Sequence, residues 1–217
     1  MNNKVNIPML AVSLALIAGI AAGLLGWVYL VTQAPIVAAS QKKTNTALRD
    51  VLPTFDNQPG DETVVVGDVT FYVGRNEGAI VGFAGETITS KGYNGNVTVL
   101  AGILPDGTLS TILVTQQAET PGLGTVVCER TRQQKTLSGL IKGTKGNGLS
   151  PNVVLDQFED KSAAQAPWSV KKDGGTLDAI TGATITSRAV ASAVSTIAET
   201  FASQRETLLA GNIGTVE

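Results

Sequence analysis

The chain contains no histidine and only one cysteine, Cys128, among its 217 residues. A single thiol cannot form an internal disulfide, and a chain without histidine lacks a principal ligand of zinc sites. Iron–sulfur clusters require several cysteines, so that class of redox centre is excluded for this chain on its own. Cys128 follows two valines, and we expect it to be a small core or turn residue rather than a redox centre.

Charge is also sparse and nearly balanced. The sequence has 16 Lys and Arg against 18 Asp and Glu, which gives a formal net charge of −2. It shows neither a basic patch nor a long run of like charges, and this argues against nucleic acid as a partner.

One segment has no charge at all. Residues 5–31 are uncharged, and the uncharged run continues to Gln41. As a helix rising about 1.5 Å per residue, 5–31 would extend roughly 40 Å, which is enough to cross a bilayer with some tilt. The apolar part of a secretory signal is shorter, at about 7–15 residues. A cleaved signal remains an alternative, because Ala38, Ala39 and Ser40 could form a processing site.

The span also contains small residues that suit helix packing. Gly19 and Gly23 form a GxxxG pair, and such surfaces let helices approach closely in lipid. We expect a partner helix, although glycine is also simply common in membrane helices.

These observations divide the chain into four parts. We predict a short N-terminus at 1–6, a transmembrane helix at 7–31, a juxtamembrane linker at 32–43 and one domain at 44–217. The last part has about 175 residues, which is enough for a single domain with a sizeable core.

The domain alternates short apolar runs with turn residues, which indicates an α+β fold with an antiparallel sheet and flanking helices. The predicted strands are 63–66, 69–73, 80–84, 86–89, 97–103 and 109–114. Gly67-Asp68 and Pro105-Asp106-Gly107 have turn chemistry between neighbouring strands. Helices are predicted at 44–52, at 133–141 and after the small and hydroxylated run at 181–187, with the last helix ending at Gly211 and Asn212, and a loop is predicted at 143–150.

A run of small and hydroxylated residues at 181–187 precedes the last helical pattern. The apolar residues of that pattern recur with helical spacing: Val190, Val194, Ile197, Phe201 and Leu208. A helix start offers unpaired N–H groups and a positive dipole end, so the run suits a phosphate. The hydroxyl of Thr184 could carry such a group covalently. The alternative is an ordinary helix cap, since Ser and Thr are favoured there.

Residues 178–184 resemble the flavinylation motif of covalent FMN-binding domains. That motif is an acidic or amide residue, two variable residues, Ser or Thr, Gly, Ala and an acceptor Thr. The residues at its fixed positions here are Asp178, Thr181, Gly182, Ala183 and Thr184. The resemblance implies that FMN is joined through its phosphate to Thr184 as a phosphoester. A separate flavin transferase, which uses FAD, would make the bond, and Asp178 would serve recognition and metal-assisted attachment.

Two further segments match the same family in order. Residues 119–124 read Glu-Thr-Pro-Gly-Leu-Gly, which alone would be a plain surface turn after a strand. In the family this loop packs over the flavin, which implies that Thr120 and Leu123 lie near the isoalloxazine ring. Residues 91–95 resemble the family's Gly-Tyr-x-Gly segment before the hairpin. Relatives often carry a histidine just before the loop, whereas this chain has Gln116 and Gln117, so no proton-handling role is carried over.

The resemblance covers nearly the whole chain and favours the G-subunit family of Rnf electron-transport complexes. The C subunit of the Na⁺-pumping NADH:quinone oxidoreductase is a close relative, but it is usually longer. The implied cofactor-binding residues are Glu119, Thr120, Gly122, Leu123, Asp178, Thr181, Gly182, Ala183, Thr184 and Ile185. Because the flavin itself performs the redox chemistry, we expect no catalytic side chain and no metal.

The implied function is a single-pass electron carrier in the inner membrane, within a complex that couples NADH and ferredoxin chemistry to Na⁺ or H⁺ movement. Its partners would be other membrane subunits and the flavin transferase. The family places the flavin domain outside the cytoplasm; the charges flanking the span are too evenly balanced to argue the orientation. A free-standing external flavoprotein and a non-redox anchored binding domain remain the alternatives.

Overall fold

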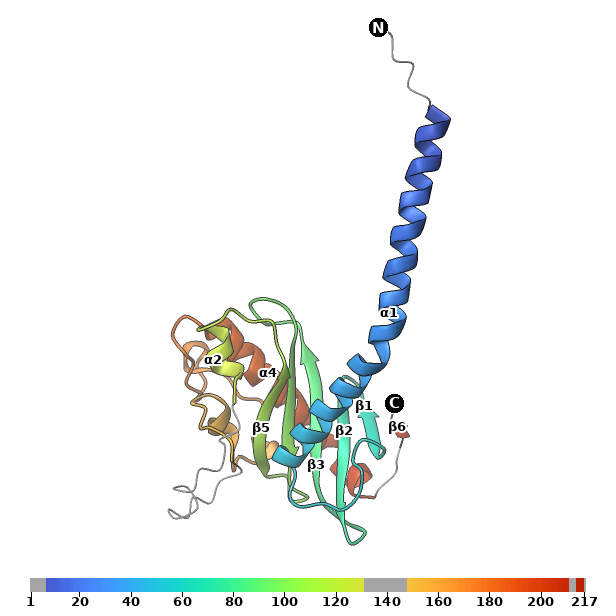
Figure 1. Cartoon of the computed structure of the whole chain (residues 1–217). Helices are drawn as coiled ribbons and strands as arrows, with labels where there is room; N and C mark the ends of the chain where they lie inside the picture. Colours follow the sequence, from blue (N-terminus) through green and yellow to red (C-terminus); the bar gives the residue numbers. More distant parts are fainter. Residues whose placement is uncertain (1–6, 131–147, 211–213, 217) are drawn as a thin grey trace, which may run out of the picture. The chain divides into compact units, whose positions relative to one another are not determined.

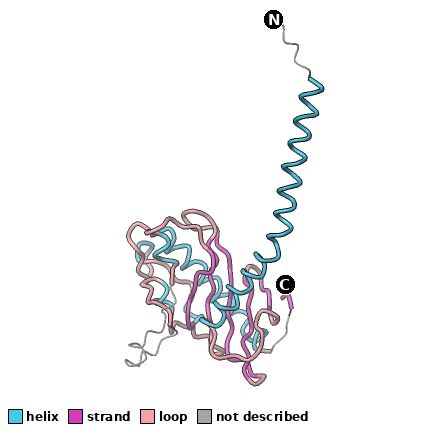
Figure 2. Tube along the Cα trace, viewed as in Figure 1, coloured by secondary structure: helices cyan, strands magenta, loops and turns pink. Residues whose placement is uncertain are grey.

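The computed structural model describes residues 7–130, 148–210 and 214–216, and Figure 2 shows the course of the chain. It comprises two compact units, Met1–Lys43 and Thr44–Glu217. The predicted N-terminus at 1–6, the predicted helix at 133–141 and most of the predicted loop at 143–150 lie outside the described residues.

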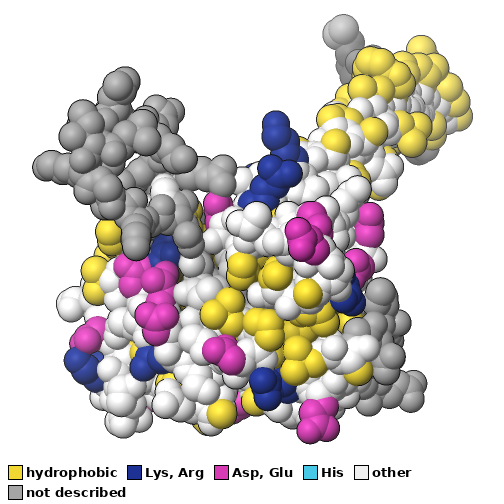
Figure 3. Space-filling model, turned by 90° about the horizontal axis from the view of Figure 1, so that it is seen from below, with side chains coloured by type: hydrophobic (Ala, Val, Ile, Leu, Met, Phe, Trp, Pro, Cys, Tyr) yellow, Lys and Arg dark blue, Asp and Glu magenta, His cyan; other side chains and the backbone are white. Residues whose placement is uncertain are grey.

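The first element is a long helix, α1 (Ile7–Val51). It is long and apolar enough to cross a membrane by length and composition, with a mean hydropathy of 2.3 over its most apolar 18-residue window. Figure 3 shows hydrophobic side chains covering its exposed part, with acidic and basic side chains scattered over the domain. The helix predicted at 44–52 is present as far as Val51, but it is not a separate helix, because these residues are the last turns of α1. Between Pro35 and Pro53 the sequence has no glycine or proline to end the helix.

The second unit is built on a six-stranded sheet in the order β5-β4-β3-β2-β1-β6 (Figure 1). The strands are β1 (Thr63–Val66), β2 (Val69–Asn76), β3 (Ala79–Thr89), β4 (Val97–Ile103), β5 (Leu109–Gln116) and β6 (Gly214–Val216). Neighbours are antiparallel except β6, which runs parallel to β1. The predicted turn at Gly67-Asp68 is confirmed, since Val66 pairs with Val69. Gly67 adopts a φ of +55°, which glycine tolerates best.

One predicted strand break does not occur. The two short strands expected on either side of Gly85 form the single strand β3. Gly85 is instead a point of close packing, because a Cβ there would lie 3.0 Å from Cε1 of Phe71 and collide with the side chain of Ile197. The glycine therefore makes room for the core rather than ending the strand.

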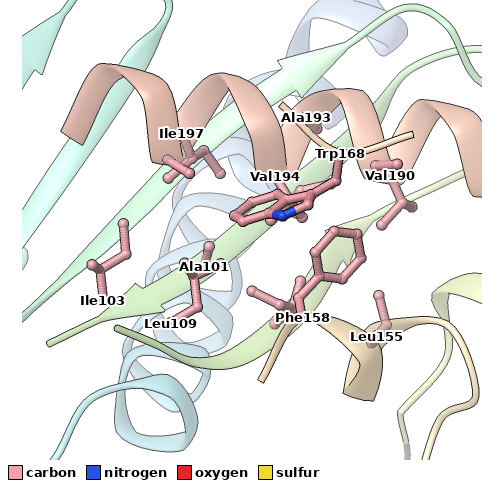
Figure 4. Close-up of a cluster of buried hydrophobic side chains, with 14 of the residues drawn as sticks. Ala101, Ile103, Leu109, Leu155, Phe158, Trp168, Val190, Ala193, Val194 and Ile197 are labelled. Carbon is pink, nitrogen blue, oxygen red and sulfur yellow. The ribbon is translucent and has the colours of Figure 1, made fainter. Parts of the chain in front are cut away.

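Helices cover both faces of the sheet. On one face lies α4 (Thr184–Leu209), whose five predicted apolar residues are all buried. Burying each such side chain stabilises the fold by roughly 1.5–3 kcal/mol. Figure 4 shows Trp168 and Phe158 between α4 and the sheet, with ring centroids 5.7 Å apart. On the other face, Leu48 and Val51 of α1 pack over Leu100 of β4.

The remaining segments connect the sheet to α4. The hairpin turn predicted at 105–107 is present, with Gly107 at a φ of +94°. After β5 comes the short helix α2 (Gly124–Cys128), and three 3₁₀ turns precede α4: η1 (Leu155–Phe158), η2 (Ala163–Gln165) and η3 (Lys171–Asp173). The α+β class is confirmed, with an antiparallel sheet and flanking helices.

Candidate functional site

The start of α4 carries the predicted acceptor, Thr184, as its first residue. Ala183 occupies the N-cap position, so no side-chain hydroxyl caps the helix there. Ser187 instead donates its hydroxyl to the carbonyl of Ala183 at 3.0 Å, from inside the helix. Gly182 turns the chain into the helix with a φ of +88°. The structure therefore shows no Ser or Thr side chain capping this helix. The N–H groups of its first turn have no N-cap side chain as an acceptor.

Three segments far apart in sequence meet around this helix start. Together with Lys172 of η3, they line an open cavity of about 400 Å³. Its lining residues are Tyr93, Glu119, Thr120, Leu123, Gly124, Lys172, Gly182, Ala183, Thr184, Ile185 and Thr186. Seven of the ten residues implied by the resemblance are in this set. The motif at 178–184, the loop at 119–124 and the segment at 91–95 therefore contribute to one site.

Glu119 connects the three segments from inside the protein. Its side chain is buried, and its carboxylate accepts a hydrogen bond from the hydroxyl of Thr186 at 2.7 Å and from the N–H of Asn94 at 3.3 Å. Gly92 and Gly124 leave space for it, because a Cβ on either would lie 2.6 or 2.5 Å from a Glu119 carboxylate oxygen. A buried carboxylate needs such partners, since an unpaired one is strongly destabilising.

The loop at 119–124 holds its shape through its own polar groups. The N–H of Leu123 donates to the carbonyl of Thr120 at 3.2 Å, and the N–H of Gly122 donates to Oγ1 of Thr125 at 2.9 Å. Gly122 has a φ of +77°, so it shapes the turn and does not line the cavity. Leu123 is left 46% exposed at the cavity rim.

Two other predicted residues lie outside the cavity lining. The carboxylate of Asp178 pairs with Nζ of Lys171 at 2.7 Å, and its N–H donates to Oε1 of Gln157 at 2.7 Å. Thr181 is exposed on the turn before α4. Gln117, two residues before Glu119, accepts the N–H of Glu119 at 2.6 Å and so supports the loop.

Four lining residues were not predicted as site residues: Tyr93, Gly124, Lys172 and Thr186. Tyr93 is 68% exposed and belongs to the Gly-Tyr-x-Gly segment, which was the signal that could have identified it. Lys172 donates from Nζ to Oγ1 of Thr184 at 3.2 Å. No sequence spacing identifies this contact, because η3 and α4 meet only in the folded domain.

Cys128 takes no part in the site chemistry. Burial, together with the nearby carboxylates of Glu119 and Glu129, raises the pKa of the Cys128 thiol to about 12. The thiol therefore stays protonated and unreactive at neutral pH. This agrees with the prediction of a small core residue.

The cavity suits a flavin mononucleotide on two counts. An uncapped helix start beside the ammonium group of Lys172 fits a phosphate. Exposed apolar side chains at the rim, Tyr93, Leu123 and Ile185, fit a flat aromatic ring. Among the residues that the structure describes, no cluster of three or more Cys, Asp or Glu residues could hold a metal ion.

Comparisons with known proteins agree with this geometry. Residues 92–199, which contain most of the three site segments, match the model of the FMN-binding domain family. The chain is 33% identical over 211 residues to the G subunit of the ion-translocating oxidoreductase complex of Pseudomonas aeruginosa, covering 92% of this chain and 91% of the relative. The same subunit of Vibrio cholerae is 33% identical over 191 residues, covering 83% of each chain. That of Pasteurella multocida is 32% identical over 194 residues, covering 85% and 88%. The chain therefore belongs to the G-subunit family of Rnf-type ion-translocating oxidoreductase complexes, and it contains that family's FMN-binding domain.

Proposed function

We propose that this protein is a membrane-anchored electron carrier whose FMN is joined to Thr184 through a phosphoester, within an Rnf-type complex. The single observation that carries the proposal is the cavity that residues of all three motif segments line, with Thr184 among them. Family membership and the apolar helix support a membrane subunit that carries electrons by FMN.

The residues divide into two groups by the part of the cofactor they suit. The start of α4, with Gly182, Ala183 and Thr184, provides N–H groups and a hydroxyl for the phosphate end. Leu123, Tyr93 and Ile185 provide apolar surface for the ring. FMN supplies the redox chemistry, and the protein positions it and sets its potential. The cavity is open to solvent, so a covalent bond would prevent loss of the cofactor by dissociation.

The relatives' names describe a multi-subunit complex that moves ions, and we extend that role to this chain. Its partners are then other membrane subunits, and a flavin transferase that uses FAD attaches the FMN. The complex would couple electron transfer between NADH and ferredoxin to Na⁺ or H⁺ movement. In this arrangement the domain from residue 44 onward lies outside the cytoplasm.

The decisive experiment is mass analysis of the chain purified from cells that contain the transferase. The peptide with Thr184 should gain the mass of one FMN less one water. Thr184→Ala should abolish the gain, and Thr184→Ser should retain part of it because serine keeps the hydroxyl. Thr176→Ala removes an exposed hydroxyl outside the cavity and serves as the matched control. An unmodified Thr184 in wild type would falsify the proposal.

A further inference from the structure

The 3₁₀ turn η3 contacts the flavinylation motif and the helix that follows it through three consecutive side chains. Lys171 pairs with the carboxylate of Asp178 at 2.7 Å. Asp173 accepts from Nε of Arg188, on the first turns of α4, at 2.6 Å. Between them, Lys172 donates to Oγ1 of Thr184 at 3.2 Å. Two ion pairs thus fix the turn against the motif and set the position of Lys172.

Lys172 differs from its two neighbours in its partner. Lys171 and Asp173 each have an oppositely charged partner, whereas Lys172 has no carboxylate within ion-pair distance among the described residues. Its one hydrogen-bond partner there is a neutral hydroxyl. The ammonium group therefore has a contact but no counter-ion.

The charges of the other lining residues also leave the ammonium group of Lys172 available to pair with a phosphate. Among the lining residues, Lys172 is the one cation and Glu119 the one anion. Glu119 is buried and already accepts hydrogen bonds from Thr186 and Asn94. A phosphodiester at Thr184 would add a negative charge that no other lining cation could offset. Uncompensated negative charge beside Glu119 would be unfavourable.

We propose that Lys172 is the residue that neutralises the phosphate of the flavin at Thr184, both while the bond forms and after it has formed. This inference rests on the proposed function and assigns a role to a side chain that the motif does not contain. In the unmodified protein, Lys172 holds the Thr184 oxygen as an acceptor. In the modified protein, it pairs with the phosphodiester that this oxygen carries.

The bond-forming step balances as a phosphoryl transfer. The bond between Oγ1 of Thr184 and the phosphorus on the flavin side of FAD forms, while the pyrophosphate P–O bond breaks. AMP leaves with the bridging oxygen, and the hydroxyl proton passes to a base of the transferase. No electrons are exchanged. The ammonium group of Lys172 stabilises the negative charge that gathers on the reacting oxygens.

The test uses the full-length apo-protein in detergent with purified transferase and FAD, and follows attachment by intact mass. Lys172→Gln should lower kcat by up to about five-fold, the upper end of the range for an exposed ion pair. Lys172→Arg keeps the charge and should stay within about two-fold of wild type. Lys161→Gln removes a lysine outside the cavity and is the matched control. High salt should narrow the difference between Lys172→Gln and wild type, because the lysine is exposed.

A second readout examines the finished holo-protein without the transferase. The ³¹P resonance of the phosphodiester should move in Lys172→Gln and stay in place in Lys161→Gln. Equal rates and equal ³¹P spectra for these two variants would overturn the role of Lys172. A change in KM alone, with unchanged spectra, would also overturn it and identify a transferase-recognition residue. An unmodified wild type overturns the proposed function as well, so the two failures are distinguishable.

Discussion

Glu119 is the residue on which the geometry of the site depends most. It lies in the loop after β5, yet its carboxylate is bonded to Thr186 of α4 and to the segment before β4 through Asn94. Only 5% of its surface is exposed. A residue that the resemblance assigned to flavin binding is therefore also a positioning residue, which holds the three cavity walls together.

We predict that Glu119→Ala destabilises the domain. The change leaves the Thr186 hydroxyl without its partner and should cost about 2 kcal/mol, equivalent to a Tm lower by about 4–8 °C for a domain of this size. Thermal unfolding followed by circular dichroism measures this. Glu199→Ala, at an exposed position on α4, should leave the Tm within about 1–2 °C of wild type. Equal Tm values for the two variants would contradict the positioning role.

Single residues are predictable from the sequence where local chemistry determines their role. Thr184 is expected at a helix start, and the apolar face from Val190 to Leu208 is expected to be buried; the structure has both. Lys172 could not be identified in this way, because its contact with Thr184 exists only once η3 is docked on α4. The flavin-binding roles of the predicted residues stay predictions.

Among the elements, the loop at 119–124 links sheet and site. It follows β5 closely, folds back through the hydrogen bond between Leu123 and Thr120, and leads into α2. Its Leu123 side chain stays partly exposed at the cavity rim, where nothing in the core requires it. Exposure of a leucine beside a cavity fits a role in covering a bound ring.

Leu123→Ala should therefore change the midpoint potential and the absorbance spectrum of the flavin and leave its attachment to Thr184 intact. Removing apolar cover admits water, which favours the charged reduced form and raises the midpoint potential. An effect of about 1 kcal/mol corresponds to about 20 mV for a two-electron couple. Spectroelectrochemistry of the holo-protein measures the shift, and Val153→Ala, an exposed apolar residue outside the cavity, is the control. Identical potentials and absorbance spectra would place the loop away from the ring.

The limits of prediction at this scale have physical causes. Gly85 predicts a strand break, but tertiary packing against Phe71 overrides the turn tendency of glycine. The strand β6 was not predicted, because three residues carry too little pattern to distinguish a short edge strand from a tail. The hairpin turns at 67–68 and 105–107, in contrast, follow from local glycine and proline chemistry and were predicted correctly.

For the whole molecule, composition and patterning were enough to predict one apolar helix and one α+β domain. Composition and patterning do not determine the side of the membrane on which the domain lies. The positive charges flanking the span are nearly balanced, so the charge rule gives no clear direction. The external position is thus a prediction that needs its own measurement.

Thiol labelling of the variant Asp106→Cys measures on which side of the membrane the domain lies. Asp106 is exposed in the turn between β4 and β5, and a thiol there should react with a membrane-impermeant reagent in intact cells whose outer membrane is permeable. The substitution is made in a Cys128→Ser background, although the buried Cys128, with its raised pKa, should react little on its own. Labelling only after lysis would place the domain in the cytoplasm and exclude an external electron carrier.

The pairing of segments far apart in sequence has a consequence for the order of events during synthesis. The edge strand β6, which pairs with β1, consists of Gly214–Val216, and the helix that fills the main core begins at Thr184. The domain therefore cannot complete its sheet or its core until residue 216 has left the ribosome. A modifying enzyme meets Thr184 either in an unfinished chain or in a complete domain. Because the cavity is complete only when α4 packs beside the loop at 119–124, we expect the proposed attachment of FMN to follow folding, and newly made protein should pass through a folded, colourless stage.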